Sequence, residues 1–452
     1  MTPTRIADWN QNARETVAAA SLGVDERTGI IKHISVQMIE PDEPRLFHAV
    51  TTATNTERLY GYAERASVTA SCGAGLTMEL ALASAIGESL ERYCSAIYDE
   101  RQLIFSSHND LRQQGLKAIA GNQLALYSDS QYRRPGFIHH RFTDDREITW
   151  TYGYSLSHEQ WILVPACLVY VPYRYTHPGD LIAFGVSTGL CCRRSLADAI
   201  LGGLYEVVER DAIMCMWMNR IPFPTVNLDS GVWLPSTLND QFSPSGIRFH
   251  LNDITTDLGI PAFFGLLIDE HNDGLAVAVG ASSNLDQEAA ALKALMEAAQ
   301  VRRWLKVMKQ DAPRSCCADF SDVISFEDHV RLFGSLNSIA YVEFLLNSPE
   351  VRSFSSVHPH VATNSEQDLE RCVHALTAKG FDVIIVDVTQ PDVAELGFHV
   401  VKVIVPGLID INSDHNYPLL GGKRLYTVPR SLGFVEHEVQ ELDFNGIPHP
   451  FP

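Results

Sequence analysis

Two periodicities of hydrophobic and polar residues divide this chain into helices and strands. A helical spacing of apolar side chains predicts long helices over residues 80–93, 195–218, 286–308 and 366–379, and a more polar one from Asn109 to Gly121. Alternating or β-branched apolar runs predict strands over residues 149–154, 161–165, 168–172, 181–186, 262–268, 275–279, 383–388 and 400–406. Because the two kinds of element interleave, the pattern predicts an α/β fold with mixed sheets and packed helices.

The same pattern predicts a short N-terminal arm followed by one large domain. Residues 1–60 mix short apolar stretches with Pro and Asp, which indicates a strand or two but no independent core. No low-complexity linker divides residues 61–452. We therefore expect a single catalytic domain that ends in a proline-rich tail at residues 448–452.

Composition and charge argue against a nucleic-acid-binding or membrane-spanning protein. The chain has 452 residues, 46% of them hydrophobic, which is enough for a large core. A net charge of −20 provides no basic field for phosphate backbones, so we expect no nucleic-acid partner. The N-terminus lacks the pattern of a signal peptide, and no apolar run is long enough to span a membrane. A cytoplasmic protein is therefore predicted. Its nine cysteines show no CxxC spacing, and we expect reduced thiols.

A charged stripe marks the first long helix. On a helical wheel, Ser84, Glu88, Glu91 and Arg92 share one face, and apolar residues occupy the opposite face. A single ExxER pattern of this kind is typical of a surface stripe with a Glu–Arg pair four residues apart. The stripe alone therefore does not indicate a site.

The ExxER pattern recurs on the helix predicted over residues 195–218, as Glu206, Glu209 and Arg210. Both helices are otherwise apolar, which indicates that even their charged faces are covered. Four covered carboxylates with two arginines repel one another unless cations offset their charge. Magnesium with a polyphosphate would do so, because Mg²⁺ is usually held by a few carboxylates together with phosphate oxygens.

Small residues precede the second charged stripe on the same helical face. They are Ala199, Gly202 and Gly203. A glycine in a helix interior costs roughly 1 kcal/mol relative to alanine. We therefore expect a ligand or a neighbouring helix to approach this face closely.

The helix predicted over residues 286–308 adds weaker signals. Glu297 and Gln300 lie one turn apart, Lys293 lies one turn earlier, and Arg302 and Arg303 follow. Small-residue loops at 71–75 and 187–189 precede the two ExxER helices, and their backbone N–H groups could approach a phosphate. The chain contains neither a Walker sequence nor a dinucleotide fingerprint.

Residues 185–189 also match the GxSxG pattern of serine hydrolases, with Ser187 at the serine position. A nucleophile elbow requires a helix to begin at the serine itself. Here Cys191–Arg194 intervene before the helix signal at Ser195. The hydrolase interpretation is therefore the weaker alternative.

The chain closes on alternating prolines at Pro448, Pro450 and Pro452, with Phe451 between the last two. Such a segment favours the stiff, extended polyproline II conformation. Chain ends are usually frayed, but a preordered tail with an apolar ring loses less entropy when it docks. We expect the tail to dock and to place its carboxylate at a fixed position.

Together these motifs resemble the YcaO family, specifically its azoline-forming branch, the D proteins of thiazole/oxazole peptide synthetases. The matching segments are residues 84–92, residues 187–190 with 206–211, residues 297–302, residues 403–408 and the tail at 448–452. The likeness covers roughly residues 25–452. Ala74 stands where the family often has lysine.

The resemblance implies an ATP- and Mg²⁺-dependent cyclodehydratase that converts Cys, Ser or Thr of a ribosomal precursor peptide into thiazoline or oxazoline. It implies Mg²⁺ ligation by Glu88, Glu91, Glu206, Glu209 and Glu297. It implies ATP contacts from Ser84, Arg92, Ser187, Arg210, Gln300 and Arg302. The tail, with Pro448, Pro450 and Pro452, would arrange the ring-forming site.

The resemblance also implies partners. These are a precursor peptide, a partner protein that binds its leader, a flavin-dependent azoline dehydrogenase and a second copy of the chain. The nearest alternative is a YcaO enzyme that forms a thioamide or amidine, and the proline tail favours azoline formation. A non-catalytic scaffold would leave the small-residue helix face unexplained.

Overall fold

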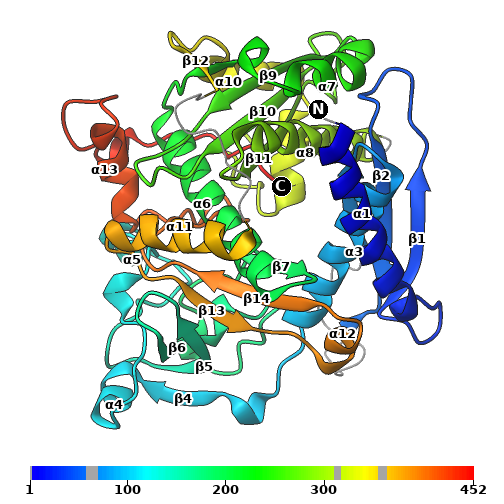
Figure 1. The fold of residues 1–452 in the computed structure, drawn as a ribbon. Helices are drawn as coiled ribbons and strands as arrows, with labels where there is room; N and C mark the ends of the chain where they lie inside the picture. The colour runs from blue at the N-terminus through cyan, green and yellow to red at the C-terminus, as the bar shows by residue number, and fades with distance from the viewer. Residues whose placement is uncertain (1–2, 57–69, 310–316, 355–363) are drawn as a thin grey trace.

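The computed structural model describes residues 3–56, 70–309, 317–354 and 364–452, which form an α/β fold with its strands in three sheets (Figure 1). The first sheet has the order β1 (Ile31–Gln37), β2 (Phe47–Ala53), β3 (Ala70–Gly75). The second runs β11 (Val277–Ser283), β10 (Ala262–Ile268), β9 (Arg248–Asp253), β8 (Thr225–Asn227), β12 (Val351–Ser353). The third runs β4 (Ile104–Ser107), β5 (Glu147–Ser155), β13 (Ile384–Asp387), β14 (His399–Ile404), β7 (Leu190–Arg193), and β6 (Gln160–Pro165) also pairs with β5.

Three long helices, α3 (Met78–Ser95), α6 (Leu196–Asn219) and α8 (Gln287–Met308), lie where these sheets meet. The other helices are α1 (Pro3–Ala20), α4 (His108–Gln113), α5 (Asp129–Arg133), α7 (Leu234–Gln241), α9 (Phe326–Phe333), α10 (Ile339–Leu346), α11 (Ser365–Ala378), α12 (Pro391–Glu395) and α13 (Lys423–Ser431). Within the described segments, no helix is both long and apolar enough to cross a bilayer.

The long helices begin at side-chain caps that the sequence supplies. Thr77 accepts a hydrogen bond from Leu80 N, Ser195 from Asp198 N, and Asp286 from Ala289 N. Each cap satisfies an N–H group that the first turn leaves without a partner. The helices predicted over residues 80–93, 195–218, 286–308 and 366–379 are confirmed, the last as α11.

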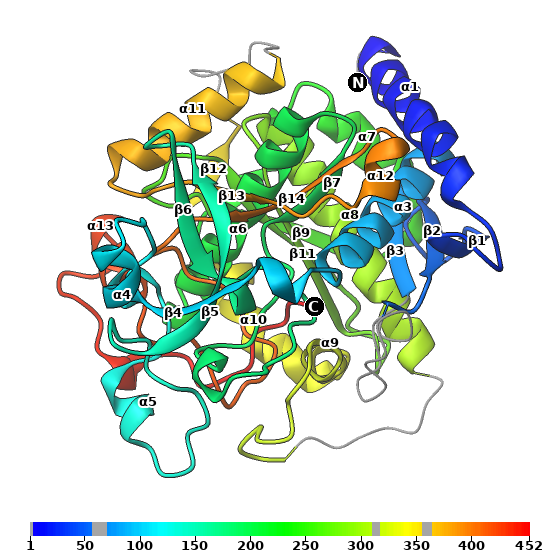
Figure 2. The same cartoon turned by 90° about the horizontal axis from the view of Figure 1, so that it is seen from below.

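The three long helices share their packing partners. Helix α8 covers β10 and β11, α3 covers β2 and β3, and α6 packs between β14 and β11. In Figure 1, α6 lies between the sheet of β10 and β11 above and β14 below, and Figure 2 shows α3, α6 and α8 converging from below. At Gly280 of β11, a Cβ atom would lie 2.4 Å from the backbone of α8. This glycine therefore lets α8 lie directly on the sheet.

The N-terminal segment departs from the prediction, since it begins with the helix α1. Its inner face carries Trp9, Ala13, Val17 and Ala20 at helical spacing, and Ala13 and Ala20 are buried. Strand β2 pairs with β1 on one side and with β3 on the other, so the N-terminal strands belong to the same sheet as β3. The predicted boundary near residue 60 falls in 57–69, outside the described residues.

Three other predicted elements are wrong. The helix predicted from Asn109 to Gly121 is only α4, because Ser107 caps it and Gly115 takes a positive φ just beyond its end. The strand predicted over 168–172 is a turn, in which Val169 N and Tyr170 N both donate to Ala166 O. Residues 181–186 form a loop that starts with a turn from Leu181 N to Pro178 O. Strand β7 was not predicted.

Candidate functional site

The charged face of α3 is anchored to the backbone of two strands. Glu88 Oε2 accepts a hydrogen bond from Cys72 N of β3 at 2.9 Å, and Glu88 Oε1 accepts from Arg92 Nε at 3.0 Å. Glu91 Oε1 accepts from Cys192 N of β7 at 2.8 Å. Because one helix spans both strands, its two carboxylates join the first and third sheets.

Helix α6 presents its own carboxylates to the same region. Glu206 Oε2 accepts from Gly189 N at 3.1 Å, and Glu206 Oε1 lies 3.4 Å from Arg210 Nη2. Glu209 Oε1 lies 3.8 Å from Arg210 Nε, and only 5% of the Glu209 side chain is exposed. The sequence correctly placed these residues on one helical face.

The small residues on α6 serve packing against a strand and its loop. A Cβ on Gly203 would lie 2.5 Å from Gly189 O, and a Cβ on Gly202 would lie 2.5 Å from Cys191 Sγ. Ala199 is completely buried. The expected close approach is real, but the neighbour is the segment of β7 rather than a ligand or helix.

Helix α8 brings Glu297 and Gln300 to the cluster. Glu297 Oε1 lies 3.4 Å from Lys293 Nζ, and Gln300 Nε2 donates to Cys72 O at 3.4 Å. Glu88, Glu206 and Glu297 keep 30%, 26% and 33% of their side chains exposed. These three carboxylates are therefore within reach of a ligand.

Arg302 does not join this cluster, and its expected contact with ATP is not supported by the geometry. Its guanidinium donates to Glu43, Asp269 and the Leu275 carbonyl, and its side chain is 2% exposed. Five residues beyond Glu297, it lies about 140° further round the helix and so faces another way.

The two predicted serines lie on separate elements. Ser84 is exposed one turn before Glu88. Ser187 is exposed in the loop before β7. Because β7 separates Ser187 from the start of α6 at Leu196, no nucleophile elbow forms, and the serine-hydrolase alternative fails on its geometry.

The cluster holds more cations than the sequence suggested. Lys293, Arg193 and Lys402 all act on its carboxylates, and Asp410 adds a further acid. The predicted charge excess is therefore smaller than four carboxylates against two arginines. One signal was visible in the sequence, because Lys402 interrupts an otherwise apolar strand.

Despite these cations, burial shifts the pKa values of several groups in the cluster. Burial raises the pKa of Glu91 to about 8, against the opposing effect of Arg193. Burial, then the neighbouring Glu297, raise the pKa of Glu209 well above its usual range. Burial also lowers the pKa of Lys402 to about 8. Some carboxyl groups of the cluster are therefore protonated near neutral pH, and a bound cation would displace those protons.

Arg210 is the residue of the cluster best suited to bind an anion. Its Nε and Nη1 atoms are buried without a hydrogen-bond partner among the described residues. Its guanidinium lies 4.1 Å from the centre of the Phe451 ring. A buried N–H group without an acceptor is costly, and a phosphate oxygen would satisfy it.

The proline-rich tail docks as expected. Phe451 is 2% exposed and belongs to the largest core cluster, while Pro448 and Pro450 are buried and Pro452 is partly exposed. Trp217 Nε1 donates to Ile447 O at 2.9 Å. The docked ring of Phe451 thus forms one wall beside Arg210.

The tail residue His449 pairs with His329 of α9, and this pair holds the tail in place. The rings of His449 and His329 stack with centroids 3.9 Å apart. His449 Nε2 donates to Asn412 O at 2.7 Å, and His449 Nδ1 accepts from Phe451 N at 3.3 Å. His329 Nδ1 donates to His449 O at 2.7 Å. Burial lowers the pKa of His329 to about 4, so both rings are neutral in this arrangement.

The residues fit a magnesium–nucleotide, although no preformed metal cage exists in the described part of the chain. There, no three His, Cys, Asp or Glu side chains converge as metal ligands. Magnesium needs no such cage, since it is often held by one or two carboxylates and substrate phosphates. Here the partly exposed carboxylates would bind Mg²⁺, and the Arg210 N–H groups that have no partner among the described residues would bind phosphate.

Comparisons with known proteins agree with this geometry. The family model for the YcaO cyclodehydratase, which binds ATP and Mg²⁺, matches residues 72–409. A heterocyclase solved in complex with substrate and cofactor is 25% identical with a TM-score of 0.79, over 97% of this chain. This chain spans 57% of that heterocyclase's length.

Two more distant structures share the fold. YcaO from Methanopyrus kandleri, bound with AMPPCP and Mg²⁺, is 18% identical with a TM-score of 0.57, over 91% of this chain and 92% of its own. The E. coli microcin synthetase McbBCD complex with pro-MccB17 bound contains a chain that is 16% identical with a TM-score of 0.57, over 83% of this chain and 87% of its own.

Proposed function

The chain belongs to the YcaO family, whose ligands are ATP and Mg²⁺, and on that premise we propose that it is an azoline-forming peptide cyclodehydratase. Its substrate is a ribosomal precursor peptide with Cys, Ser or Thr. The observation that carries the proposal is Arg210, which lies close to Glu209 and to the docked Phe451 and has two N–H-bearing nitrogens without a partner among the described residues.

The chain's own residues divide the work of holding the nucleotide. Glu88, Glu91, Glu206, Glu209 and Glu297 would hold Mg²⁺, and Arg92 and Arg210 would bind phosphate oxygens. Ser84, Ser187 and Gln300 would add neutral contacts to ATP. When bound, Mg-ATP supplies an electrophilic γ-phosphorus.

The proposed reaction removes the elements of water from the peptide. The thiol or hydroxyl of the substrate bonds to the preceding carbonyl carbon, and the amide oxygen bonds to the γ-phosphorus as ADP leaves. The C–O bond then breaks, phosphate carries away that oxygen, and the peptide gives up its side-chain and amide protons. The docked tail, with Pro448, Pro450 and Pro452, arranges the ring-forming site.

Partners belong to the proposal as well. A chain of the same fold occurs in the microcin synthetase complex with pro-MccB17 bound. We therefore expect a leader-binding partner protein, a second copy of this chain and, in the same assembly, a flavin-dependent azoline dehydrogenase. The cytoplasmic location stays a prediction.

Mass spectrometry of a leader-bearing Cys/Ser peptide, incubated with partner protein and Mg-ATP, tests the reaction. We expect loss of one water mass per ring together with ATP turnover. Glu209→Gln and deletion of residues 451–452 should each abolish ring formation. An unchanged peptide mass without nucleotide binding would refute the proposal, and a thioamide would instead show exchange of oxygen for sulfur.

A further inference from the structure

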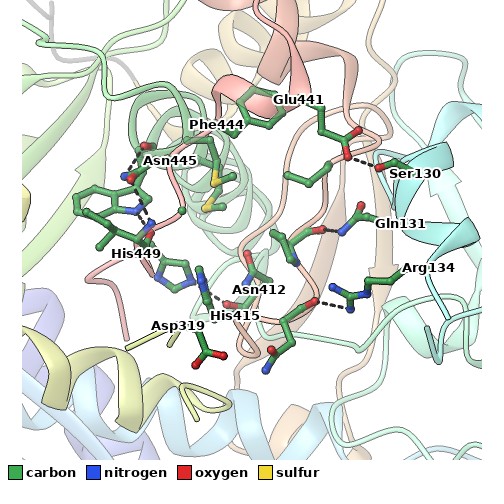
Figure 3. A pocket seen from close by; sticks show the side chains of 18 of the residues that line it. Ser130, Gln131, Arg134, Asp319, Asn412, His415, Glu441, Phe444, Asn445 and His449 are labelled. Atoms are coloured by element: carbon green, nitrogen blue, oxygen red, sulfur yellow. Dashed lines mark hydrogen bonds between the residues drawn. The ribbon is translucent and has the colours of Figure 1, made fainter. Parts of the chain in front are cut away.

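A cavity of about 680 Å³ lies beside the docked tail, and none of the clustered carboxylates lines it. Figure 3 shows Asn445 and the tail residue His449 on one side, with Gln131 of α5 and Arg134, the residue after α5, on the other. Its volume is within the roughly 300–1,000 Å³ range of small-ligand sites.

The charges around the cavity are balanced. Two arginines, Arg133 and Arg134, and two acids, Asp319 and Glu441, line it. Burial lowers the pKa of His415, which leaves that ring neutral near pH 7. A phosphate or other anion would need an excess of cations. The electrostatics therefore favour an uncharged ligand.

Four side-chain amides contribute to the polar lining, those of Gln131, Asn412, Asn416 and Asn445. Gln131 and Asn416 each donate to a backbone carbonyl and so hold the wall in place. Asn412 donates through Nδ2 to Asp414 O, and its Oδ1 has no partner in the described structure. Amides offer acceptors and donors of the kind that a peptide backbone requires.

Part of the apolar lining comes from α6. Met214, Trp217 and Met218 follow Arg210 on the same helix, and Phe444, labelled in Figure 3, adds an aromatic ring. This surface suits small or apolar side chains. Charged side chains would lose hydration there without gaining a partner.

The cavity is joined to the proposed nucleotide site through the tail. Arg210 contacts Phe451, Phe451 N donates to His449, and His449 lines the cavity. Arg210 and Met214 are four residues apart, which is about 6 Å along the helix axis. An extended peptide covers that distance with about two residues.

We propose that this cavity binds the residues of the precursor peptide that flank the Cys, Ser or Thr to be cyclised, as a neutral peptide segment. The inference rests on the proposed function, since it assigns the cavity to that reaction's substrate. It predicts a preference for small or apolar residues beside the reacting one, and discrimination against Asp and Lys.

Gly446 offers a way to fill the cavity without disturbing its wall. It lines the cavity and is exposed, its φ is not positive, and a Cβ there would meet no heavy atom within 4 Å. Gly446→Trp should therefore occupy the cavity, whereas Gly446→Ala should not. Leu442→Trp, at a 98% exposed position outside the cavity, is the matched control.

The probe is acetyl-Gly-Ala-Gly-Cys-Gly-Ala-amide, used with the full chain and its partner protein, together with a copy carrying photoleucine in place of the second alanine. We expect crosslinks in residues 214–218, 412–420 or 445–449. Gly446→Trp should reduce crosslinking and raise KM for the peptide at least tenfold. Gly446→Ala and Leu442→Trp should change both by less than twofold.

The outcomes separate this inference from the proposed function. Cyclisation by the wild type, with crosslinks elsewhere and an unaffected Gly446→Trp variant, overturns the cavity assignment alone. Crosslinks in the cavity that Gly446→Trp blocks, without ring formation by the wild type, overturn the proposed function and retain a peptide site. Bound nucleotide in the Gly446→Trp variant shows that it is folded.

Discussion

Arg302 on α8 and Arg210 on α6 are both buried among carboxylates, but their hydrogen bonding differs. Arg302 donates to two carboxylates and one carbonyl at 2.8–3.0 Å. Arg210 lies 3.4 and 3.8 Å from its carboxylates, and two of its nitrogen atoms have no hydrogen-bond partner in the part of the chain that the structure describes. Both arginines lie on long helices that also carry glutamates.

The difference shows how a structural ion cluster is told from a binding site. A buried charge with complete hydrogen bonding stabilises its own surroundings and has no capacity for another ligand. A buried charge with open N–H groups carries an energetic cost that a ligand can remove. The following predictions test whether the Arg302 cluster supports the fold while the Arg210 cluster binds nucleotide.

The largest effect is expected from Arg302→Met. The change removes the guanidinium from Asp269 and leaves Glu43, which is 5% exposed, with Lys306 as its cation partner. Removing one member of a buried pair typically costs about 3–5 kcal/mol in the free energy of unfolding. Urea unfolding measures this loss. Nucleotide affinity of the folded protein should stay within twofold, and a large loss of affinity with unchanged stability would reverse our assignment of the two clusters.

Ligand stabilisation comes next in size. At 100 times its Kd, AMPPCP with Mg²⁺ should raise the free energy of unfolding of the wild type by about 2.7 kcal/mol. Chelation of Mg²⁺ with EDTA should remove the effect. The Arg302→Met protein should be stabilised by a similar amount, whereas Glu209→Gln should not respond. Equal stabilisation of Glu209→Gln would place the nucleotide elsewhere.

A smaller loss, in affinity, is expected from Arg210→Gln. Loss of a charged hydrogen-bond donor should cost about 2 kcal/mol of AMPPCP binding, or roughly thirtyfold in Kd, measured by calorimetry. Stability without nucleotide should change by less than about 1 kcal/mol, because neighbouring carboxyl groups can take up protons.

Arg424→Gln is the matched control for that experiment. Arg424 is buried and bonded to Asp211 and Asp257, so its loss should lower stability rather than affinity. If both variants lost affinity equally, open N–H groups would not identify the binding arginine.

The smallest effect concerns pH and the tail beside Arg210. Burial lowers the pKa of His329 to about 4, and undocking of the tail would restore it toward 6.5. The docked state binds fewer protons than the undocked state. The contribution of His329 to docking is therefore fully present above pH 6.5 and is lost as the pH falls toward 4. The loss is about 1.4 kcal/mol per pH unit for this histidine.

Hydrogen exchange of residues 445–452 at pH 7.5 and 5.5 measures that dependence. His415, Arg210 and Asp328 also face the pair and are left unchanged. His329→Gln removes one titrating ring and should flatten the response. Exchange that does not depend on pH beyond its intrinsic chemistry would show that the histidines do not control docking.

The long helices and their charged faces could be predicted because helical periodicity is local. Caps such as Ser195 and Asp286 follow directly from residue type. The same local signal placed Glu206, Glu209 and Arg210 on one face. Applied to the third long helix, it also places Arg302 about 140° away from Glu297, so the expected ATP contact of Arg302 came from the resemblance alone. Periodicity cannot show which N–H groups of Arg210 lack an acceptor, because hydrogen-bond completeness depends on residues far away in the chain.

The parts that were missed depend on tertiary contacts. The strand β7 has only four residues, and its neighbour β14 lies about 200 positions later, so its pairing leaves little trace in the local pattern. Arg193 and Lys402 reach the cluster through those two strands. The glycines of α6 were read correctly as a close approach, but sequence alone could not identify the neighbour.

Helix α6 runs unbroken from Leu196 to Asn219, with Glu206 and Glu209 in its middle and Trp217 near its end. One residue inserted between Asp211 and Met214 would turn every later side chain by about 100° and shift it by about 1.5 Å. The carboxylates and the cavity wall would then no longer face their present neighbours. Homologous genes should therefore vary the composition of this segment freely at some positions, yet conserve its length without insertions or deletions.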